Sequence, residues 1–535
     1  MTKKLFLALL APALMGGLMA CNKQANSDLD PEAQSTGDTY MSVTFTTANP
    51  NSTARAAVKE DESFNSIGEY IGRDDIKNVN VYVIDSDKET VELKEFAAVT
   101  ENPDGDDNTK DFRTEAWKTT AGDKIIYVYV NIKGTKIEEA LNAATSKTLF
   151  EKAAKEAYAL TKDGVVLEGI AKYNKNDNKD IIAMAPIEPK TLTVTAGVTK
   201  EDAEKKPFAQ AKNCVQVSVR RLVAQAAVTA TAEEFSITEN RGGAEKTLAK
   251  LTDLKWDAMQ FEKTTYLTPK ADGTNDAKLA KFCMSPSFSF LPTTTNYVAG
   301  ADNAGGKYEY RKFDLTKANA VSKFTRNADD KENVKAIVAT PMKFITETTH
   351  QLGGKLQADG GAAPFTGYRE GNTTYVIVSA KITPDETAWA DGQKDKYTAN
   401  ADLFFGVQDH KFYAEENVAK AANKRSTEFT DGRDNVVKYA GGRCYYVAWL
   451  NPNEKGADKV TSSPILRNNI YHVNITAIKK LGFSGNPYNP NGDDPQDPDG
   501  PNKPNPENPL YKTETFMSTE VIVVDWGVHS NDQEL

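Results

Sequence analysis

The chain has 535 residues, of which 39% are apolar and 26% charged, and its formal net charge is −10. This length exceeds what one hydrophobic core normally supports, so we expect two or more domains. No basic stripe stands out along the sequence, which argues against nucleic-acid binding. The acidic balance indicates a soluble, self-repelling protein and nothing more specific.

Residues 1–21 have the pattern of a targeting segment rather than of folded structure. Lys3 and Lys4 form a positive start, and the apolar run over 5–18 is too short for a mature membrane-spanning helix. The run ends in LMAC, the kind of sequence that lipoprotein signal peptidase reads, so Cys21 is predicted to carry a lipid. An ordinary signal peptide followed by an incidental cysteine is the alternative. No later stretch reaches the ~18 apolar residues of a membrane helix, so any later membrane attachment would be through the lipid.

The sequence carries no recognisable catalytic or metal-binding motif. Its four histidines are far apart, and HExxH, GxSxG, P-loop and paired CxxC patterns are missing from it. Beyond Cys21 the cysteines are too widely spaced for a disulfide framework or a zinc site. Cys214 and Cys444 adjoin apolar β-type runs, which favours buried free thiols, and His472 lies in a strand-like run as a structural histidine. We therefore expect neither an enzyme nor a cofactor or metal.

A short alternating segment follows the targeting sequence. Residues 22–39 are polar and lack periodicity, as in a flexible tether. Residues 40–46 alternate between apolar and polar side chains, which predicts a half-buried strand beginning at Tyr40. Its apolar face carries Met41, Val43 and Phe45. A polar breaker stretch that contains Arg55 comes next.

Strand patterns dominate the rest of the chain, with frequent Gly, Asn and Pro turns typical of β-sandwiches. The clearest strand runs are 79–83, 125–130, 215–219, 375–380, 444–450 and 470–478. One helical island is expected at about 136–161. We place a domain boundary near 232, which gives an N-terminal domain at 56–232 and a C-terminal domain at 233–482.

The C-terminal part of the chain differs in composition. Residues 483–515 are rich in Pro, Asn, Asp and Gly, as in a semi-rigid spacer that could span roughly 100 Å at ~3.1 Å per residue. A further β-type segment follows at 516–535. Because an unpaired strand at the end of a long spacer is prone to aggregate, we expect this segment to have a partner strand. Its opening, TFMST, echoes the TYMSV at the start of the first strand.

Several blocks of the sequence are distinctive: YMS at 40–42, GEY at 68–70, IKNVNVYVID, TTYVIVSAKITP at 373–384, DLFFGVQDHKFY at 402–413, YYVAWLNP at 445–452, SPILRNNIYHVNITAIKKLGFSGNP at 463–487, PENPL at 506–510 and TFMSTEVIVVDWGVHS at 515–530. Together these blocks resemble the fimbrillins of Bacteroidales type V pili, and specifically the major subunit of the short fimbriae. The resemblance begins at the targeting segment and is most specific in the C-terminal third.

This resemblance implies an all-β fold with minor helix, built from two tandem transthyretin-like β-sandwich domains and an extended C-terminal donor strand. It also implies export as a lipoprotein held at the outer membrane, and cleavage by an arginine-specific protease between Arg55 and Ala56. The groove vacated by the first strand would then accept a strand from another subunit, giving a homopolymer on the cell surface. The implied partners are further copies, tip and anchor subunits, and host or bacterial receptors for adhesion and biofilm formation.

The residue pattern agrees with this route, because a cut at Arg55 would release the lipid and the first strand together and leave an open sheet edge. Cleavage at Arg73 or Lys59 remains open, as do a tip or anchor role and a non-polymerising surface lipoprotein that binds glycan or a host ligand. The predicted donor-strand residues are Phe516, Met517, Val521, Ile522, Val523, Val524, Trp526 and Val528.

Overall fold

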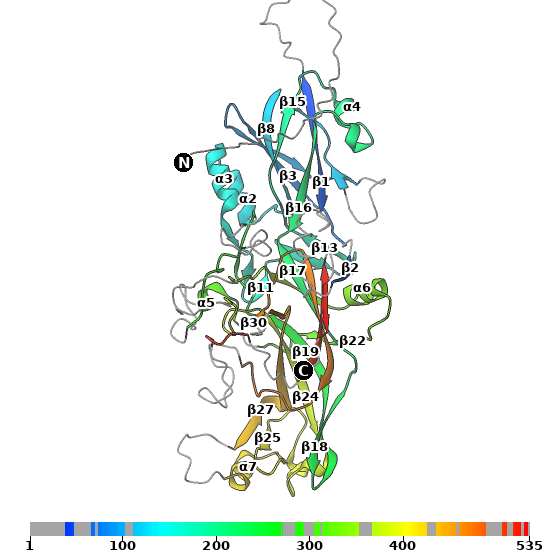
Figure 1. Ribbon diagram of the computed structural model, residues 1–535, viewed down its shortest axis with the longest axis vertical. Coiled ribbons are helices and arrows are strands. Elements are labelled where there is room, and N and C mark those ends of the chain that lie inside the picture. The colour runs from blue at the N-terminus through cyan, green and yellow to red at the C-terminus, as the bar shows by residue number, and fades with distance from the viewer. Residues whose placement is uncertain are drawn as a thin grey trace, which may run out of the picture.

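The protein is mostly β, as predicted, and it is elongated, with two β-rich units arranged along the long axis (Figure 1). The computed structural model describes residues 38–47, 66–69, 73–101, 111–268, 270, 284–293, 304–310, 313–351, 366–424, 435–455, 460–487, 506–510, 517–525 and 529–532. The transthyretin-like topology of the two units remains a prediction.

The first unit is built on a sheet that contains the N-terminal strand in its interior. The strand order is β4 (Val91–Phe96), β3 (Val79–Asp85), β8 (Gly122–Val130), β14 (Met184–Pro186), β16 (Cys214–Arg221), β1 (Thr39–Thr47), β6 (Asp111–Arg113) and β5 (Thr100–Glu101). In addition, β15 (Lys190–Val194) pairs with β8, and β7 (Trp117–Thr119) pairs with β1. The predicted strands at 40–46, 79–83, 125–130 and 215–219 are confirmed.

The predicted helical island divides into two helices, α2 (Lys136–Asn142) and α3 (Lys147–Lys155). The division follows from the sequence, because Thr135 and Ser146 each accept a hydrogen bond from a backbone N–H of the first turn that follows. A new cap at Ser146 starts a second helix instead of continuing the first. The helical island expected at about 136–161 is thus made of two helices and was predicted too long, because the chain is already extended in β9 (Ala157–Ala159).

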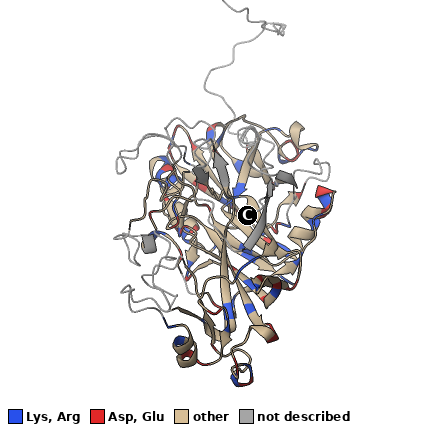
Figure 2. Cartoon of the chain, turned by 60° about the horizontal axis from the view of Figure 1, so that its bottom comes forward, with Lys and Arg blue, Asp and Glu red and all other residues tan. Residues whose placement is uncertain are grey.

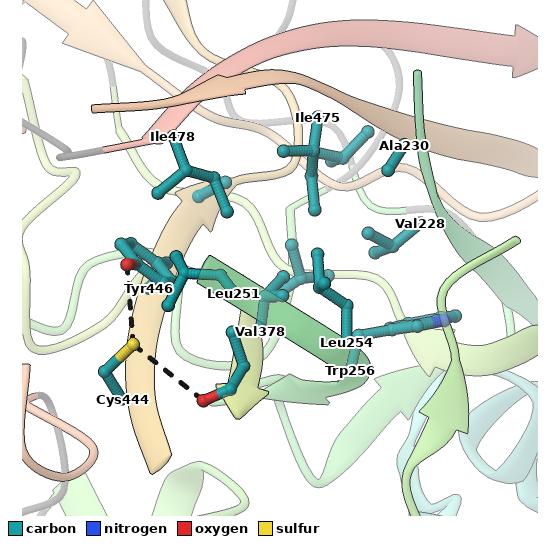
Figure 3. Packing of buried hydrophobic residues seen from close by; sticks show 14 of the residues in the cluster. Val228, Ala230, Leu251, Leu254, Trp256, Val378, Cys444, Tyr446, Ile475 and Ile478 are labelled. Atoms are coloured by element: carbon teal, nitrogen blue, oxygen red, sulfur yellow. Dashed lines mark hydrogen bonds between the residues drawn. The ribbon is translucent and has the colours of Figure 1, made fainter. Parts of the chain in front are cut away.

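The second unit has two facing sheets. One has the order β2 (Ser66–Glu69), β32 (Met517–Asp525), β31 (Asn469–Ile478), β17 (Val223–Ala230) and β22 (Ser322–Lys323), with β23 (Met342–Thr346) also on β17. The other has the order β18 (Phe235–Arg241), β19 (Ala244–Met259), β24 (Tyr375–Pro384) and β28 (Arg443–Trp449). Apolar side chains from both sheets fill the space between them, as Figure 3 shows for Trp256, Val378 and Ile475.

Cys444 lies in this core as a buried free thiol, as predicted. Its sulfur contacts the Tyr446 hydroxyl at 3.4 Å and the Ala380 carbonyl at 3.9 Å (Figure 3). Burial raises the pKa of the Cys444 thiol to about 11, which keeps it protonated and unreactive. Cys214 is also free but only half-buried, so the prediction of burial was too strong there.

The chain crosses between the units earlier than the boundary at 232 requires. β16 ends at Arg221 in the first sheet, and β17 starts at Val223 in the second, so the crossing falls at Leu222. Leu222 is fully buried in an apolar cluster that draws residues from both units. The Arg221 guanidinium donates to Asp74 of the first unit and Asn468 of the second. β16 and β17 form one continuous path through the two sheets, with no break in composition at the crossing.

The proline-rich segment predicted as a free spacer at 483–515 is docked on the second unit at both ends. Phe483 exchanges two backbone hydrogen bonds with Tyr445, and residues 506–510 lie against the turn at 369–371. The prediction of a continuous spacer was therefore wrong at 483–487 and 506–510. Residues 488–505 and 511–516 lie outside the described part of the chain.

The remaining described elements are short connections and small sheets. They are β10 (Thr161–Lys162), β11 (Val165–Val166), β12 (Ala171–Asn174), β13 (Lys179–Ile182), α4 (Lys200–Ala203), η1 (Phe208–Gln210), β20 (Thr264–Tyr266), α5 (Ala304–Lys307), β21 (Asn319–Ala320), α6 (Asp330–Val338), η2 (Glu386–Ala388), η3 (Lys394–Lys396), β25 (Leu403–Gly406), β26 (Phe412–Tyr413), α7 (Glu416–Ala422), β27 (Val436–Tyr439), η4 (Ala440–Gly442), β29 (Asn453–Lys455), β30 (Val460–Ser462) and β33 (His529–Asp532).

Basic and acidic residues are interspersed over the view in Figure 2, which shows no extended region of one sign. None of the helices in the described ranges is both long and apolar enough to cross a membrane.

Candidate functional site

The first strand lies in a groove whose two sides are other strands. On one side β1 runs parallel to β16, with Ser42 opposite Cys214 and Phe45 opposite Val217. On the other side it is antiparallel to β6 over Thr44–Thr46 and to β7 over Thr39–Met41. Both edges of β1 are therefore hydrogen-bonded, and removal of the strand would open two rows of backbone groups at once.

The apolar face of β1 is fully buried. Met41, Val43 and Phe45 have no exposed surface and belong to one cluster with side chains of β3, β8 and β16. The Phe45 ring stacks on Phe112, with centroids 5.2 Å apart and planes 19° from parallel. These side chains fill pockets in the first unit, and the alternating pattern of the sequence predicted this face correctly.

The polar face of β1 is buried as well, which corrects the prediction of a half-buried strand. The Ser42 hydroxyl donates to the Ala203 carbonyl at 2.7 Å, and the Thr44 hydroxyl donates to the Val215 carbonyl at 3.3 Å. The Thr46 hydroxyl accepts from the Gln216 amide at 2.7 Å. Small hydroxyl side chains can be buried in this way because backbone carbonyls and an amide satisfy them. Alternation alone could not separate such a face from an exposed one.

The N-terminal end of β1 is fixed by Asn213, which the sequence analysis did not single out. The Asn213 amide donates to the Tyr40 carbonyl at 3.0 Å and to the Thr195 carbonyl at 2.9 Å. The Thr39 hydroxyl donates to the same Thr195 carbonyl at 2.7 Å. Asn213 has a φ of 46°, a conformation that asparagine tolerates better than most residues. The only signal in the sequence was an asparagine directly before a strand-like run.

The C-terminal strand forms as predicted, but it is not free. β32 lies between β31 and β2 in the second unit, antiparallel to β31 with Ile522 opposite His472 and Val524 opposite Ile470. A hairpin with β33 covers part of it. In Figure 1 β32 is the red strand next to the label β2. Sequence patterns could not reveal this pairing because it joins strands distant in the chain.

The predicted site residues fall into two groups. The first-strand residues Tyr40, Met41, Val43 and Phe45 lie together in the groove, and Met517, Val521, Ile522, Val523 and Val524 lie on β32. The predicted lipidation site Cys21, the cleavage pair Arg55 and Ala56, and the donor-strand residues Phe516, Trp526 and Val528 lie outside the described residues.

A group of buried ionisable side chains in the second unit escaped the sequence analysis. Burial raises the pKa of Glu262 to about 8 and that of Glu370 to about 7, and lowers that of His350 to about 4. Glu262 accepts a hydrogen bond from the Ser287 N–H at 2.7 Å, while its Oε2 has no partner among the described residues. His472 is buried as predicted, with Nε2 2.7 Å from the Thr229 hydroxyl, and burial lowers its pKa to about 3.

Over the described ranges, no three His, Cys, Asp or Glu side chains converge as metal ligands would. The most distinctive feature of the described residues is the first strand, which fills a groove between other strands.

Two kinds of comparison relate the chain to known sequences. The model of the family described as "Major fimbrial subunit protein type IV, Fimbrillin, C-terminal" matches residues 437–532. Two curated proteins, each described as "Minor fimbrium subunit Mfa1" of Porphyromonas gingivalis, are 35% identical over 534 residues, covering 97% of this chain and 97% of theirs.

Solved structures of fimbrial proteins also match. A fimbrilin (fimA) from Porphyromonas gingivalis W83 has 13% identity and a TM-score of 0.37, covering 92% of this chain and 99% of that one. The tip fimbrial protein Mfa3 from Porphyromonas gingivalis has 13% identity and a TM-score of 0.33, covering 83% and 96%. These scores are low, so the assignment depends on the sequence match along the whole chain. The chain belongs to the Mfa1 family of fimbrial subunits, the fimbrillins, and is a component of a cell-surface fimbria.

Proposed function

We propose that the chain is the shaft subunit of its fimbria and that it polymerises by strand exchange. It is exported, receives a lipid on Cys21 and is held at the outer membrane by that lipid. An arginine-specific protease cuts after Arg55, and the C-terminal strand of another copy takes the place of β1. Tip and anchor subunits complete the fimbria, which supports adhesion to host or bacterial receptors and biofilm formation.

The observation that carries this proposal is the position of β1. It is an interior strand with both edges paired and both faces buried, yet it is the first described strand and joins the rest of the chain only through the segment after Thr47. A cut in that segment would leave Phe112, Val217 and Val219 facing an empty groove. An added strand of similar pattern would regain the backbone hydrogen bonds and refill the pockets.

The contacts of Arg73 support Arg55 as the cleavage point. The Arg73 guanidinium lies 2.9 Å from the Asp180 carboxylate, and it also donates to the Asn178 side chain and to the Val338 carbonyl of the second unit. Only 15% of the Arg73 side chain is exposed. A protease would have to dismantle the junction between the units to bind this arginine.

Replacing Arg55 with alanine is expected to stop processing. The uncut precursor would keep β1 in its own groove, block the incoming strand and stay associated with the membrane through its lipid. The readout is the polymer ladder on a gel of unheated surface protein, together with the mass of the subunit. Lys59→Ala is the matched control and should process normally, giving a mature N-terminus at Ala56.

Normal ladders from Arg55→Ala would show that another site suffices. Mature subunits that begin at lipidated Cys21 within the fimbria would point instead to an anchor role.

A further inference from the structure

The segment just before the C-terminal strand is fastened to the second unit. Residues 506–510 run antiparallel to the turn that begins at Arg369, with Arg369 paired to Pro509. The Glu370 N–H donates to the Asn508 carbonyl at 2.9 Å, and the Gly371 N–H donates to the Pro506 carbonyl at 3.2 Å. The Asn508 amide also donates to the Glu370 carboxylate at 3.4 Å. This is strand-like pairing, not a passing contact.

Leu510 completes the attachment. Its side chain is 1% exposed and lies in an apolar cluster with Tyr368, Tyr375 and Trp449. The Tyr375 and Trp449 rings in that cluster meet edge to face, with centroids 6.0 Å apart. Burial of the Leu510 side chain therefore holds residues 506–510 against the turn at 369–371, to which they are hydrogen-bonded.

The upstream end of the proline-rich stretch is fastened near the same place. Phe483 and Tyr445 exchange hydrogen bonds of 2.8 and 2.9 Å, and the Tyr375 hydroxyl donates to Asn486 at 2.9 Å. A Cβ on Gly482 would lie 2.2 Å from the Tyr445 carbonyl oxygen, so glycine allows this close approach. Tyr375 therefore contacts both ends, and residues 488–505 join two points on one surface.

We propose that residues 506–510 act as a clasp that fixes where the C-terminal strand departs, so that residues 511–516 alone set its reach to an acceptor subunit. This inference rests on the proposed strand exchange. The proline-rich stretch then adds no length to the connection between residues 506–510 and the C-terminal strand.

The clasp changes the reach of the donor strand severalfold. Seven residue steps separate Leu510 from Met517, and at 3.3–3.6 Å each they span at most about 25 Å. A free spacer over 483–515 would span roughly 100 Å. Because strand capture fails when a linker cannot span its two sites, the acceptor groove must lie close to Leu510 of the donor.

Matched deletions of equal size test the clasp. Removing residues 512–514 should abolish polymer, because the short connection loses almost half its length. Removing residues 493–495 should leave the polymer ladder and the axial repeat of the fimbriae unchanged. If residues 483–515 were instead one free spacer, both deletions should leave the polymer ladder unchanged. That result would overturn the clasp.

A second variant separates loss of reach from loss of folding. Leu510→Asp in the 512–514 deletion should release the clasp and restore polymer, because the proline-rich stretch would now supply the missing length. Failure of this rescue would also count against the clasp. Deleting residues 516–535 tests strand exchange itself: polymer from that truncation overturns the proposed function, whereas loss of polymer there with a silent 512–514 deletion overturns the clasp alone.

Discussion

Replacing Phe45 with aspartate should destabilise the first unit of the uncut precursor by about 4 kcal/mol or more. Phe45 has no exposed surface, stacks on Phe112 and contributes to the cluster with Val217. Truncating a buried phenylalanine costs about 3–5 kcal/mol, and a carboxylate in an apolar pocket adds to that. The measurement is the free energy of unfolding from urea denaturation of the precursor.

Leu149→Asp is the control, because it adds the same charge at a side chain on α3 that is 50% exposed. It should change the free energy of unfolding by less than about 1 kcal/mol. If Phe45→Asp changed the free energy of unfolding equally little, β1 would not fill the groove in the precursor. Strand exchange, which begins with β1 in that groove, would then be contradicted.

The second large effect is expected from pH, through Glu262 in the second unit. Burial raises the pKa of Glu262 to about 8, so the folded protein holds this proton at neutral pH. The unfolded chain releases the same proton near pH 4.3. Because the folded state binds more protons across this interval, the Glu262 contribution to stability is complete below about pH 4 and is lost as pH rises to about 8.

Glu262→Gln removes this titration while keeping the size of the side chain. Between pH 5 and pH 9 the variant should gain on the wild type by on the order of 4 kcal/mol in free energy of unfolding, at 1.36 kcal/mol per unit of pKa shift. The difference between variant and wild type is the quantity to measure, since Glu370 also loses stability up to about pH 7. His350 and His472, with lowered pKa values, act in the opposite sense at acid pH. A difference that stays constant from pH 5 to pH 9 would contradict this assignment.

Local patterns in the sequence predicted the elements well and their partners poorly. The alternation at 40–46 identified β1 because apolar residues two apart mark one face of a strand, and the strand-like run at 470–478 identified β31. The same alternation does not say which strands pair, so the docking of β32 between β31 and β2 was missed. It also could not show that Ser42 and Thr44 would find buried acceptors.

Amino-acid composition gave a wrong prediction where a polar stretch contacts a surface formed by distant strands. The proline-rich stretch was predicted to be a spacer throughout, yet Leu510 and Asn486 are buried against the second unit. Isolated apolar or amide residues in a polar stretch give no periodic signal, so their docking depends on a surface built by distant strands. The change from the first to the second sheet at Leu222 was also missed, because the strands before and after Leu222 have similar sequence patterns.

The native thiol of Cys214 offers the most direct test of strand exchange, because Cys214 lies opposite Ser42 of β1 in the groove. Each residue from Met517 to Asp525 would be replaced in turn by cysteine, and intact fimbriae would be oxidised and separated without reductant. If the C-terminal strand of one subunit occupies the groove of the next, the cysteine that comes to lie opposite Cys214 should join subunits into a covalent ladder, whereas cysteines two residues away lie too far for a disulfide. The ladder should vanish when Cys214→Ser is added. Fimbriae that assemble normally yet give no Cys214-dependent cross-link at any of these positions would contradict strand exchange.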